Sequence, residues 1–202
     1  MLVRRGLLRI VTGVPAANDD REAAIVEALR AGLLDGLADA YDLWHDRVRV
    51  LARRLLGDDA AAEDVVQEVF SALPTATRSF REEVGLETFV LAIAVKRAHH
   101  HRRVAARRRE ALARLRTAEL AAGPGGADPE RETYRRQLAR SLERALDGLP
   151  HAQRVAFVLC EVEGLSSGDA AAIADVPEAT VRTRLFHARR KLRASLAPEH
   201  DE

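Results

Sequence analysis

The sequence predicts an all-α protein made of two small helical domains joined by a flexible linker, and three observations carry this prediction. Only 4% of the 202 residues are aromatic, while Ala, Leu, Arg and Glu are abundant. Unbranched side chains lose little rotamer freedom in a helix, so this composition favours helix over strand. Apolar residues recur at intervals of three and four, the period of one helix face. Glycines and prolines gather in one internal stretch, AAGPGGADPE at 121–130, which has no hydrophobic period.

Bulk composition narrows the class of protein. A hydrophobic content of 47% with a charged content of 31% is typical of packed cores below a charged surface. The net charge is only +1, so any affinity for nucleic acid must come from how the charges are distributed. Cys160 is the single cysteine, which excludes an internal disulfide, and we expect a cytoplasmic protein. The longest apolar run, residues 89–95, is about a third of the ~20 residues that cross a bilayer, so we expect no membrane insertion.

Breaks in the hydrophobic pattern, with the glycines and prolines at 121–130, predict the domain boundaries. Residues 1–24 form a loose leader, whose short apolar run is interrupted by Arg9 and is too brief for a signal peptide. Residues 25–116 form the first helical domain, 117–135 the flexible linker, and 136–197 the second domain.

The first domain is expected to contain three main helices. The first runs from about Leu37 to Leu56 and stops at Gly57. In the second, the buried stripe has the spacing i, i+3, i+4, i+7 and comprises Val66, Val69, Phe70 and Leu73. Asp64, Gln67 and Glu68 then point outward. The third, around 86–95, is apolar almost all round and is expected to lie centrally.

The second domain is expected to end in a helix-turn-helix. Its first two helices have the buried stripes Leu142, Ala145, Leu146, Leu149 and Val155, Val158, Leu159, Val162. Ser166 precedes Asp169 by three residues, a variant of the capping box that starts a short helix. A three-residue turn at 175–177 then leads into a last helix from Glu178.

The last helix has a cationic outer face. From Glu178 to Arg193 there are six Arg or Lys residues against one acid, so this helix alone would be drawn to phosphates. Residues early in a recognition helix reach base edges and later ones hold phosphates. The candidate base readers are Glu178, Ala179, Arg182, Thr183 and Phe186, and the candidate phosphate contacts are Arg184, Arg189, Arg190 and Lys191. The alternative is a solvated basic helix that packs against a protein.

Two segments resemble a known family. AEDVVQEVFSAL at 62–73 resembles conserved region two of bacterial sigma factors, and the stretch from LPHAQRV to RKLRASL at 149–196 resembles region four. The resemblance covers roughly residues 25–197. With no domain between the two matches, the chain resembles the small extracytoplasmic-function (ECF) group of RNA polymerase sigma factors.

This resemblance implies a non-enzymatic role in transcription initiation, with no cofactor and no metal. Its expected partners are core RNA polymerase, promoter DNA and an anti-sigma factor. The residues matching the docking helix are Asp64, Gln67 and Glu68. The residues expected to contact the minus-ten element are Thr88, Lys96, Arg97, His100, Arg102 and Arg103. The residues expected at the minus-thirty-five element are Glu178, Ala179, Arg182, Thr183, Arg184, Phe186, His187 and Arg190.

The sequence departs from the family pattern at several places. Pro74 lies where many relatives carry a large aromatic, and we expect the docking helix to end or kink near Leu73. Lys96 stands where Asn is usual, and Asp175 occupies a turn position often held by Gly, which Asp tolerates in the left-handed region. His99, His100 and His101 point about 100° apart around a helix, so polar contact with DNA is favoured over a metal site.

The sequence also bears on two other classes of function. A stand-alone helix-turn-helix regulator would bind palindromic DNA without polymerase, and its first domain would sense a ligand or dimerise. A small hydrolase lacks support, because no G-x-S-x-G, P-loop or H-E-x-x-H motif is present.

Overall fold

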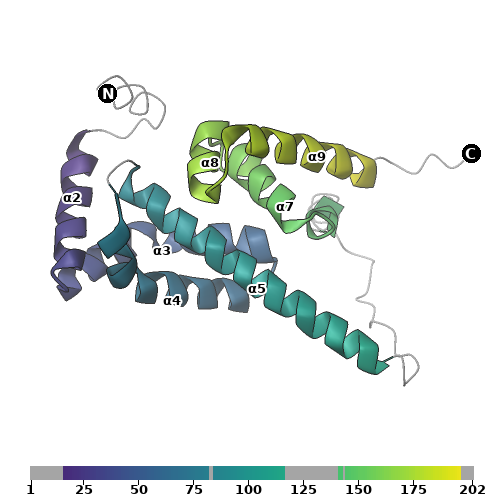
Figure 1. Cartoon of the computed structure of the whole chain (residues 1–202), viewed down its shortest axis with the longest axis horizontal. Coiled ribbons are helices and arrows are strands. Elements are labelled where there is room, and N and C mark those ends of the chain that lie inside the picture. Colours follow the sequence, from purple (N-terminus) through teal and green to yellow (C-terminus); the bar gives the residue numbers. More distant parts are fainter. Residues whose placement is uncertain (1–15, 82–83, 117–140, 143, 197–202) are drawn as a thin grey trace, which may run out of the picture.

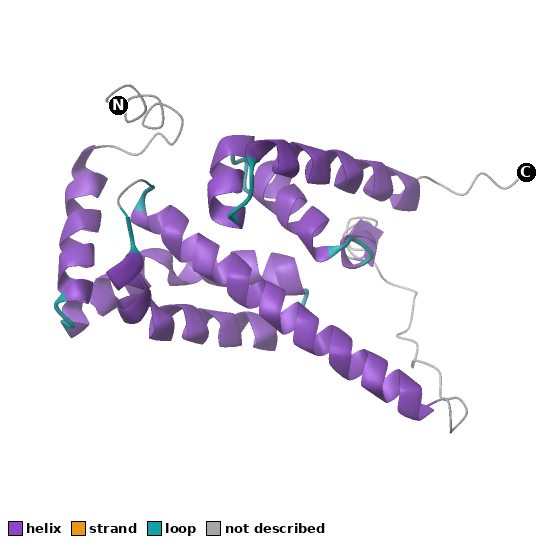
Figure 2. Ribbon diagram, viewed as in Figure 1, coloured by secondary structure: helices purple, strands orange, loops and turns teal. Residues whose placement is uncertain are grey.

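A computed structural model describes residues 16–81, 84–116, 141–142 and 144–196, and within these ranges every regular element is a helix (Figure 2). The elements are α2 (Ala16–Arg30), α3 (Leu34–Leu56), α4 (Asp59–Ala76), the 3₁₀ turn η1 (Thr77–Ser79), α5 (Leu86–Arg116), α7 (His151–Phe157), the π-helical turn η2 (Val158–Val162), α8 (Ser167–Ala174) and α9 (Glu178–Leu196). The all-α prediction is confirmed. We call α2 to α5 the first module and the described residues from 141 to 196 the second module.

The first module is a helical bundle built around α5. Figure 1 shows α5 crossing α3 and α4, with the second module on its other side. Gly57 adopts a left-handed conformation (φ 74°) that ends α3, and the Asp58 side chain accepts a hydrogen bond from the Ala61 amide at 2.7 Å, which caps α4. Trp44 on α3 is buried in the core of the bundle. These local signals set where α3 ends and where α4 begins.

The N-terminal part of the first module differs from the prediction. A loose leader was expected through residue 24, but α2 begins at Ala16, so the prediction is wrong for residues 16–24. Ile25, Val26 and Leu29 from this helix are buried in the core. Helix α2 also packs closely on α3, because a Cβ on Gly36 of α3 would lie only 2.6 Å from the Ala28 Cβ. The leader before Ala16 and the expected linker at 117–135 lie outside the described residues.

The end of the docking helix also differs from expectation. α4 continues past Leu73 and includes Pro74, ending at Ala76. Pro74 has no amide hydrogen to donate to the carbonyl four residues earlier, and its ring crowds that carbonyl. Only two residues of α4 follow it. The Thr77 hydroxyl then donates to the Pro74 carbonyl at 3.0 Å as the chain passes into η1.

The helix-turn-helix in the second module is confirmed. The Ser166 hydroxyl accepts from the Asp169 amide at 3.1 Å, which starts α8 as predicted. Asp175 ends α8 in the left-handed region at φ 53°. Two members of the expected stripes are exposed, because Leu142 and Val162 keep 38% and 43% of their surface.

The two modules pack against each other along α5. Val155, Val158, Leu159 and Ile173 of the second module belong to the same continuous core cluster as the first module. A smaller separate cluster lies under α9, where Leu149, Ala188 and Leu192 are buried together. Within the described ranges, no helix is both long and apolar enough to span a membrane.

Candidate polymerase-docking face and nucleic-acid interface

The exposed face of α4 carries two of the three predicted docking residues. Val65, Val66 and Val69 are buried against the bundle, which turns Asp64 and Gln67 to solvent. A carboxylate and an amide presented side by side on a rigid helix suit a polar protein interface.

Glu68, the third predicted docking residue, is engaged inside the first module. Its Oε1 lies 2.9 Å from His101 Nε2 and its Oε2 lies 3.6 Å from Arg97 Nη1, both on α5. The side chain is only 37% exposed. Glu68 therefore points outward only in part, because its position at the edge of the stripe also lets it reach the basic side chains of α5.

The predicted minus-ten residues lie along α5 but differ in how free they are. Lys96 is exposed and its Nζ lies 3.1 Å from Asp175 Oδ2 of the second module. Arg102 donates to the Leu55 carbonyl at the end of α3 at 3.2 Å. These cations are thus held by the protein itself.

The remaining members of this set are more open. His100 and Arg103 are exposed on α5, and Thr88 is half-buried near its start. Arg97 faces Glu68, as described above. This basic row of α5 does not share one face. Lys96, His100 and Arg103 lie on one exposed face, while Arg97 and Arg102 turn toward α4 and α3.

The first turns of α9 hold an ordered polar cluster. The Ser167 hydroxyl donates to Glu178 Oε1 at 2.6 Å, and Arg182 forms an ion pair with the same carboxylate. The Ser167 hydrogen bond, and then Arg182, hold the pKa of Glu178 below its usual range. The carboxylate therefore stays charged and draws the guanidinium of Arg182 toward the N-terminal end of the recognition helix.

The rest of the α9 surface matches the prediction of an open basic face. Phe186 is 62% exposed, and its ring meets that of His187 edge-on with centroids 5.5 Å apart. Thr183 donates to the Ala179 carbonyl at 2.9 Å, so its hydroxyl is partly used within the helix. Arg190 is exposed and Arg184 is half-buried.

Several functional side chains were missed by the sequence analysis. Ser167 contributes to the cluster on α9 although its neighbour Ser166 makes the cap. Arg189, expected on phosphate, forms an ion pair with Glu161 across the second module. The i, i+4 spacing of Glu178 and Arg182 is a signal that the sequence already contained; the Ser167 and Glu161 contacts depend on tertiary packing.

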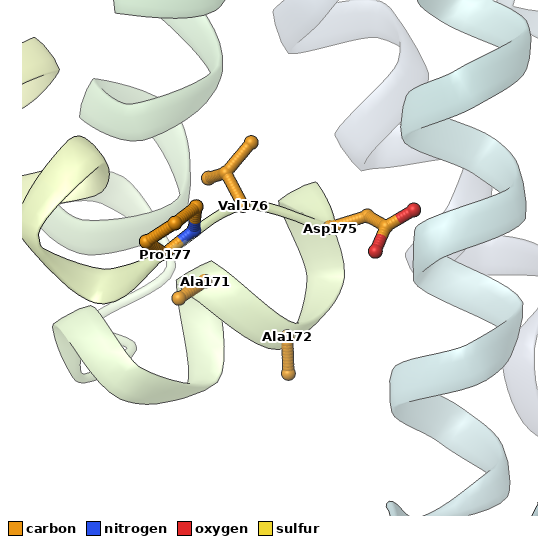
Figure 3. Close-up of a pocket in the computed structure, with 5 residues that line it drawn as sticks. All are labelled: Ala171, Ala172, Asp175, Val176 and Pro177. Carbon is orange, nitrogen blue, oxygen red and sulfur yellow. The ribbon is translucent and has the colours of Figure 1, made fainter.

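The histidines and Cys160 are the remaining candidate metal ligands of the chain. In the part of the chain that the structure describes, no group of three His, Cys, Asp or Glu side chains is placed to hold a metal ion. Cys160 is half-buried against the core, and burial raises the pKa of its thiol. The Asp175 side chain projects from the turn of the helix-turn-helix toward α5, beside a shallow hollow lined by Ala171, Ala172, Val176 and Pro177 (Figure 3).

Comparison with known proteins identifies the class. The family model for Sigma-70 region 2 matches residues 40–108, and that for Sigma-70, region 4 matches residues 139–192. Both modules therefore match one class of protein, the RNA polymerase sigma factors of the sigma-70 family. The first module is the bundle with the exposed α4 face, and the second is the basic helix-turn-helix.

Relatives narrow the class further. The chain is 30% identical over 168 residues to the RNA polymerase sigma-H factor of Pseudomonas aeruginosa, covering 79% of this chain and 87% of the relative. It is 34% identical over 182 residues to the ECF RNA polymerase sigma-E factor of Haemophilus influenzae, covering 88% and 96%. The chain belongs to the ECF group of the sigma-70 family. It is a sigma factor that directs RNA polymerase in transcription initiation, and the stand-alone regulator is not favoured.

Solved structures agree on the fold. A complex of the sigma factor RpoE with the anti-sigma factor NepR from Bartonella quintana matches with a TM-score of 0.56 at 22% identity, covering 80% of this chain and 97% of that one. CnrH in complex with the cytosolic domain of CnrY matches with a TM-score of 0.59 at 21% identity, covering 86% and 95%.

Proposed function

We propose that this sigma factor divides its work among three helices. The outer face of α4 docks on core polymerase through Asp64 and Gln67, the basic row of α5 contacts the minus-ten element, and α9 reads the minus-thirty-five element. The chain supplies no catalytic group to the reaction, because nucleotide addition belongs to the polymerase. The site of action is then the cytoplasm, where the polymerase works.

The observation that carries this proposal is the ordered cationic start of α9. Arg182 is held at the helix N-terminal end by a charged Glu178, while Phe186 is exposed one turn further on. A guanidinium can donate to both guanine acceptors in the major groove, and an exposed aromatic can meet a thymine methyl. Arg184 and Arg190 lie around the same helix and suit phosphate contacts.

The row on α5 supports the second assignment. Lys96, Arg97, Arg102 and Arg103 fall within two turns of one helix, next to His100. Cations spaced along a helix follow the phosphate backbone of a strand, and binding of this kind weakens steeply with salt. Thr88 supplies a hydroxyl near the start of the same helix.

An anti-sigma factor is the expected regulatory partner. Two proteins of the same fold are described in complexes with such partners. We propose that this chain also binds one.

Docking is tested by size exclusion of the purified chain with sigma-free core polymerase. The double variant Asp64→Ala, Gln67→Ala is expected to lose comigration, since truncating exposed polar anchors of an interface costs about 1 to 3 kcal/mol each. The matched control is Asp39→Ala, Asp42→Ala, which removes exposed side chains of the same spacing from α3. Equal comigration of all three proteins would place the docking surface elsewhere on the chain.

A further inference from the structure

The first residue of α9 is bound to the first residue of α8 through a hydroxyl. Ser167 begins α8 and donates from its Oγ to Glu178 Oε1, at the start of α9, over 2.6 Å. The neighbouring Ser166 is already engaged, since its hydroxyl caps α8 and donates to Asp169 Oδ2 at 2.7 Å. The two adjacent serines therefore differ in role, because Ser166 stabilises its own helix and Ser167 holds a side chain of the recognition helix.

Glu178 in turn holds Arg182. The Nη2 of Arg182 donates to the same Glu178 Oε1, and its Nε donates to Ser167 Oγ at 3.4 Å. Each of these three side chains contacts the other two, and we call them the α8–α9 cluster. In the sequence from Glu178 to Arg193, Glu178 is the single acid among six Arg or Lys residues. The one carboxylate of this cationic helix is therefore paired with one particular arginine.

The cluster uses one edge of the Arg182 guanidinium. Nε and Nη2 lie on the same side of the planar group, and both donate within the cluster. Among the described residues, Nη1 has no hydrogen-bond partner. The outer edge, formed by Nη1 and Nη2, can donate two parallel hydrogen bonds to O6 and N7 of a guanine. Because the side chain is 68% exposed, DNA can reach this edge.

Orientation of this arginine before binding favours base contact over backbone contact. A guanidinium binds phosphate as well as guanine, and a phosphate contact carries no sequence information. A mobile arginine loses rotamer entropy when a base fixes it, whereas an oriented one loses less. The Glu178 carboxylate adds to the effect, since it repels a phosphate placed at the same turn of the helix.

We propose that Ser167 and Glu178 are positioning residues that fix Arg182 for bidentate recognition of a guanine in the minus-thirty-five element. This rests on the proposed role of α9 in reading that element. Glu178, expected from the sequence to read a base, then acts through Arg182, and Ser167 sets promoter preference without touching DNA. The Ser167 hydrogen bond lowers the pKa of Glu178, so the pairing with Arg182 persists at neutral pH.

The base preference of the complex with polymerase tests this role. The wild-type chain with core polymerase first selects a promoter duplex from a pool randomised in the minus-thirty-five element. Each base pair of the selected element is then substituted singly, and dissociation constants are measured by fluorescence anisotropy at two salt concentrations. Arg182→Ala is expected to flatten the preference at one G·C pair, which identifies the pair that Arg182 reads.

Ser167→Ala is expected to lower the preference at that same pair by about three- to tenfold, the worth of one hydrogen bond. Alanine is a good helix former, so the variant should fold, and circular dichroism checks this. Its salt dependence should equal that of the wild type, because no phosphate contact is lost. In the Arg182→Ala background, Ser167→Ala should have no further effect. Ser167→Thr keeps the hydroxyl and should restore the preference.

Two more variants separate positioning from other roles. Ser195→Ala removes an exposed hydroxyl near the other end of α9, which donates to the Lys191 carbonyl at 3.0 Å, and should leave the preference unchanged. Glu178→Gln removes the charge at nearly constant size and should lower the preference at the pair read by Arg182. A changed preference at a different pair would make Glu178 a base reader itself, which overturns its positioning role.

Three results would overturn the positioning role of Ser167. In the first, Arg182→Ala flattens the preference and Ser167→Ala does not. In the second, Ser167→Ala lowers the salt dependence, which would place its hydroxyl on a phosphate. In the third, Ser167→Ala still changes the preference in the Arg182→Ala background. A different result, in which Arg182→Ala leaves every preference intact, contradicts the proposed base reading by Arg182 and leaves the cluster no base contact to position.

Discussion

The two modules of this sigma factor are stabilised in different ways. The first buries large side chains from α2, α3 and α4 around α5, including Leu51, Leu55 and Leu73. The second buries several alanines, among them Ala156 and Ala170, and shares its main core with the first. Small residues bury little apolar area, which is the main source of stability. The second module therefore depends on α5 for part of its stability.

The largest predicted effect breaks this shared core. Leu159→Ala removes a fully buried side chain of the second module that belongs to the continuous cluster, and the cavity is expected to cost 2 to 5 kcal/mol. Trp44 is the single tryptophan and is buried in α3, so its fluorescence reports on unfolding of the first module. If the modules are coupled, the urea midpoint followed by Trp44 falls in Leu159→Ala.

The control for this experiment lies in the smaller cluster. Leu192→Ala empties a buried site packed with Leu149 and Ala188, away from the shared core. It is expected to destabilise the second module and to leave the Trp44 midpoint almost unchanged. A Trp44 midpoint that does not respond to Leu159→Ala would show that the first module is stable without its neighbour.

Local sequence signals predicted the elements better than their relations in space. The cap at Ser166, the turn at Asp175 and the stop at Gly57 are short-range devices, and all three occur as predicted. The contacts of Glu68 were not predicted, because its partners lie on another helix, 29 and 33 residues away at Arg97 and His101. Side-chain direction on one helix cannot reveal such contacts.

No pattern in the sequence predicted the contact between the two modules. Arg154 reads in the sequence as one more basic residue on an amphipathic helix, yet it is buried at the end of α3. Glycines and prolines at 121–130 predicted the linker, but a flexible connection does not say whether the two domains touch. The exposure of Val162 has the same origin, because the π-helical turn changes which residues face inward.

The second prediction concerns the DNA-reading surfaces of the two modules. Arg182→Ala on α9 is expected to cost about 1 to 3 kcal/mol on a minus-thirty-five duplex and to relax preference at one base position. Arg103→Ala on α5 is expected to weaken minus-ten strand binding uniformly and to reduce its salt dependence. Titrations on substituted promoters at two salt concentrations separate the two behaviours. Uniform loss from Arg182→Ala would assign that residue to phosphate.

The smallest predicted effect is on the pH dependence of the packing between the two modules. We call the packed arrangement the closed form and the separation of the modules opening. Burial at the junction is the main reason why the pKa of His151 is lowered from 6.5 to about 3, with further contributions from His99 and Arg102 on α5 and Arg154 on its own helix. Opening exposes the ring and returns the pKa toward 6.5, so the open form binds more protons. This contribution to the stability of the closed form is therefore fully present above pH 6.5 and is lost progressively as the pH falls toward 3.

At pH 5.5 this linkage is expected to weaken closure by on the order of 1 kcal/mol. Small-angle scattering should then show a larger radius of gyration at pH 5.5 than at pH 7.5. Neither ring nitrogen of His151 has a hydrogen-bond partner within the described structure, so His151→Phe keeps the ring packing and removes the titration. The variant should stay closed at both pH values. An expansion of equal size in His151→Phe would assign the response to other groups, with the carboxylates of the Arg54–Glu163 and Lys96–Asp175 pairs as the next to substitute.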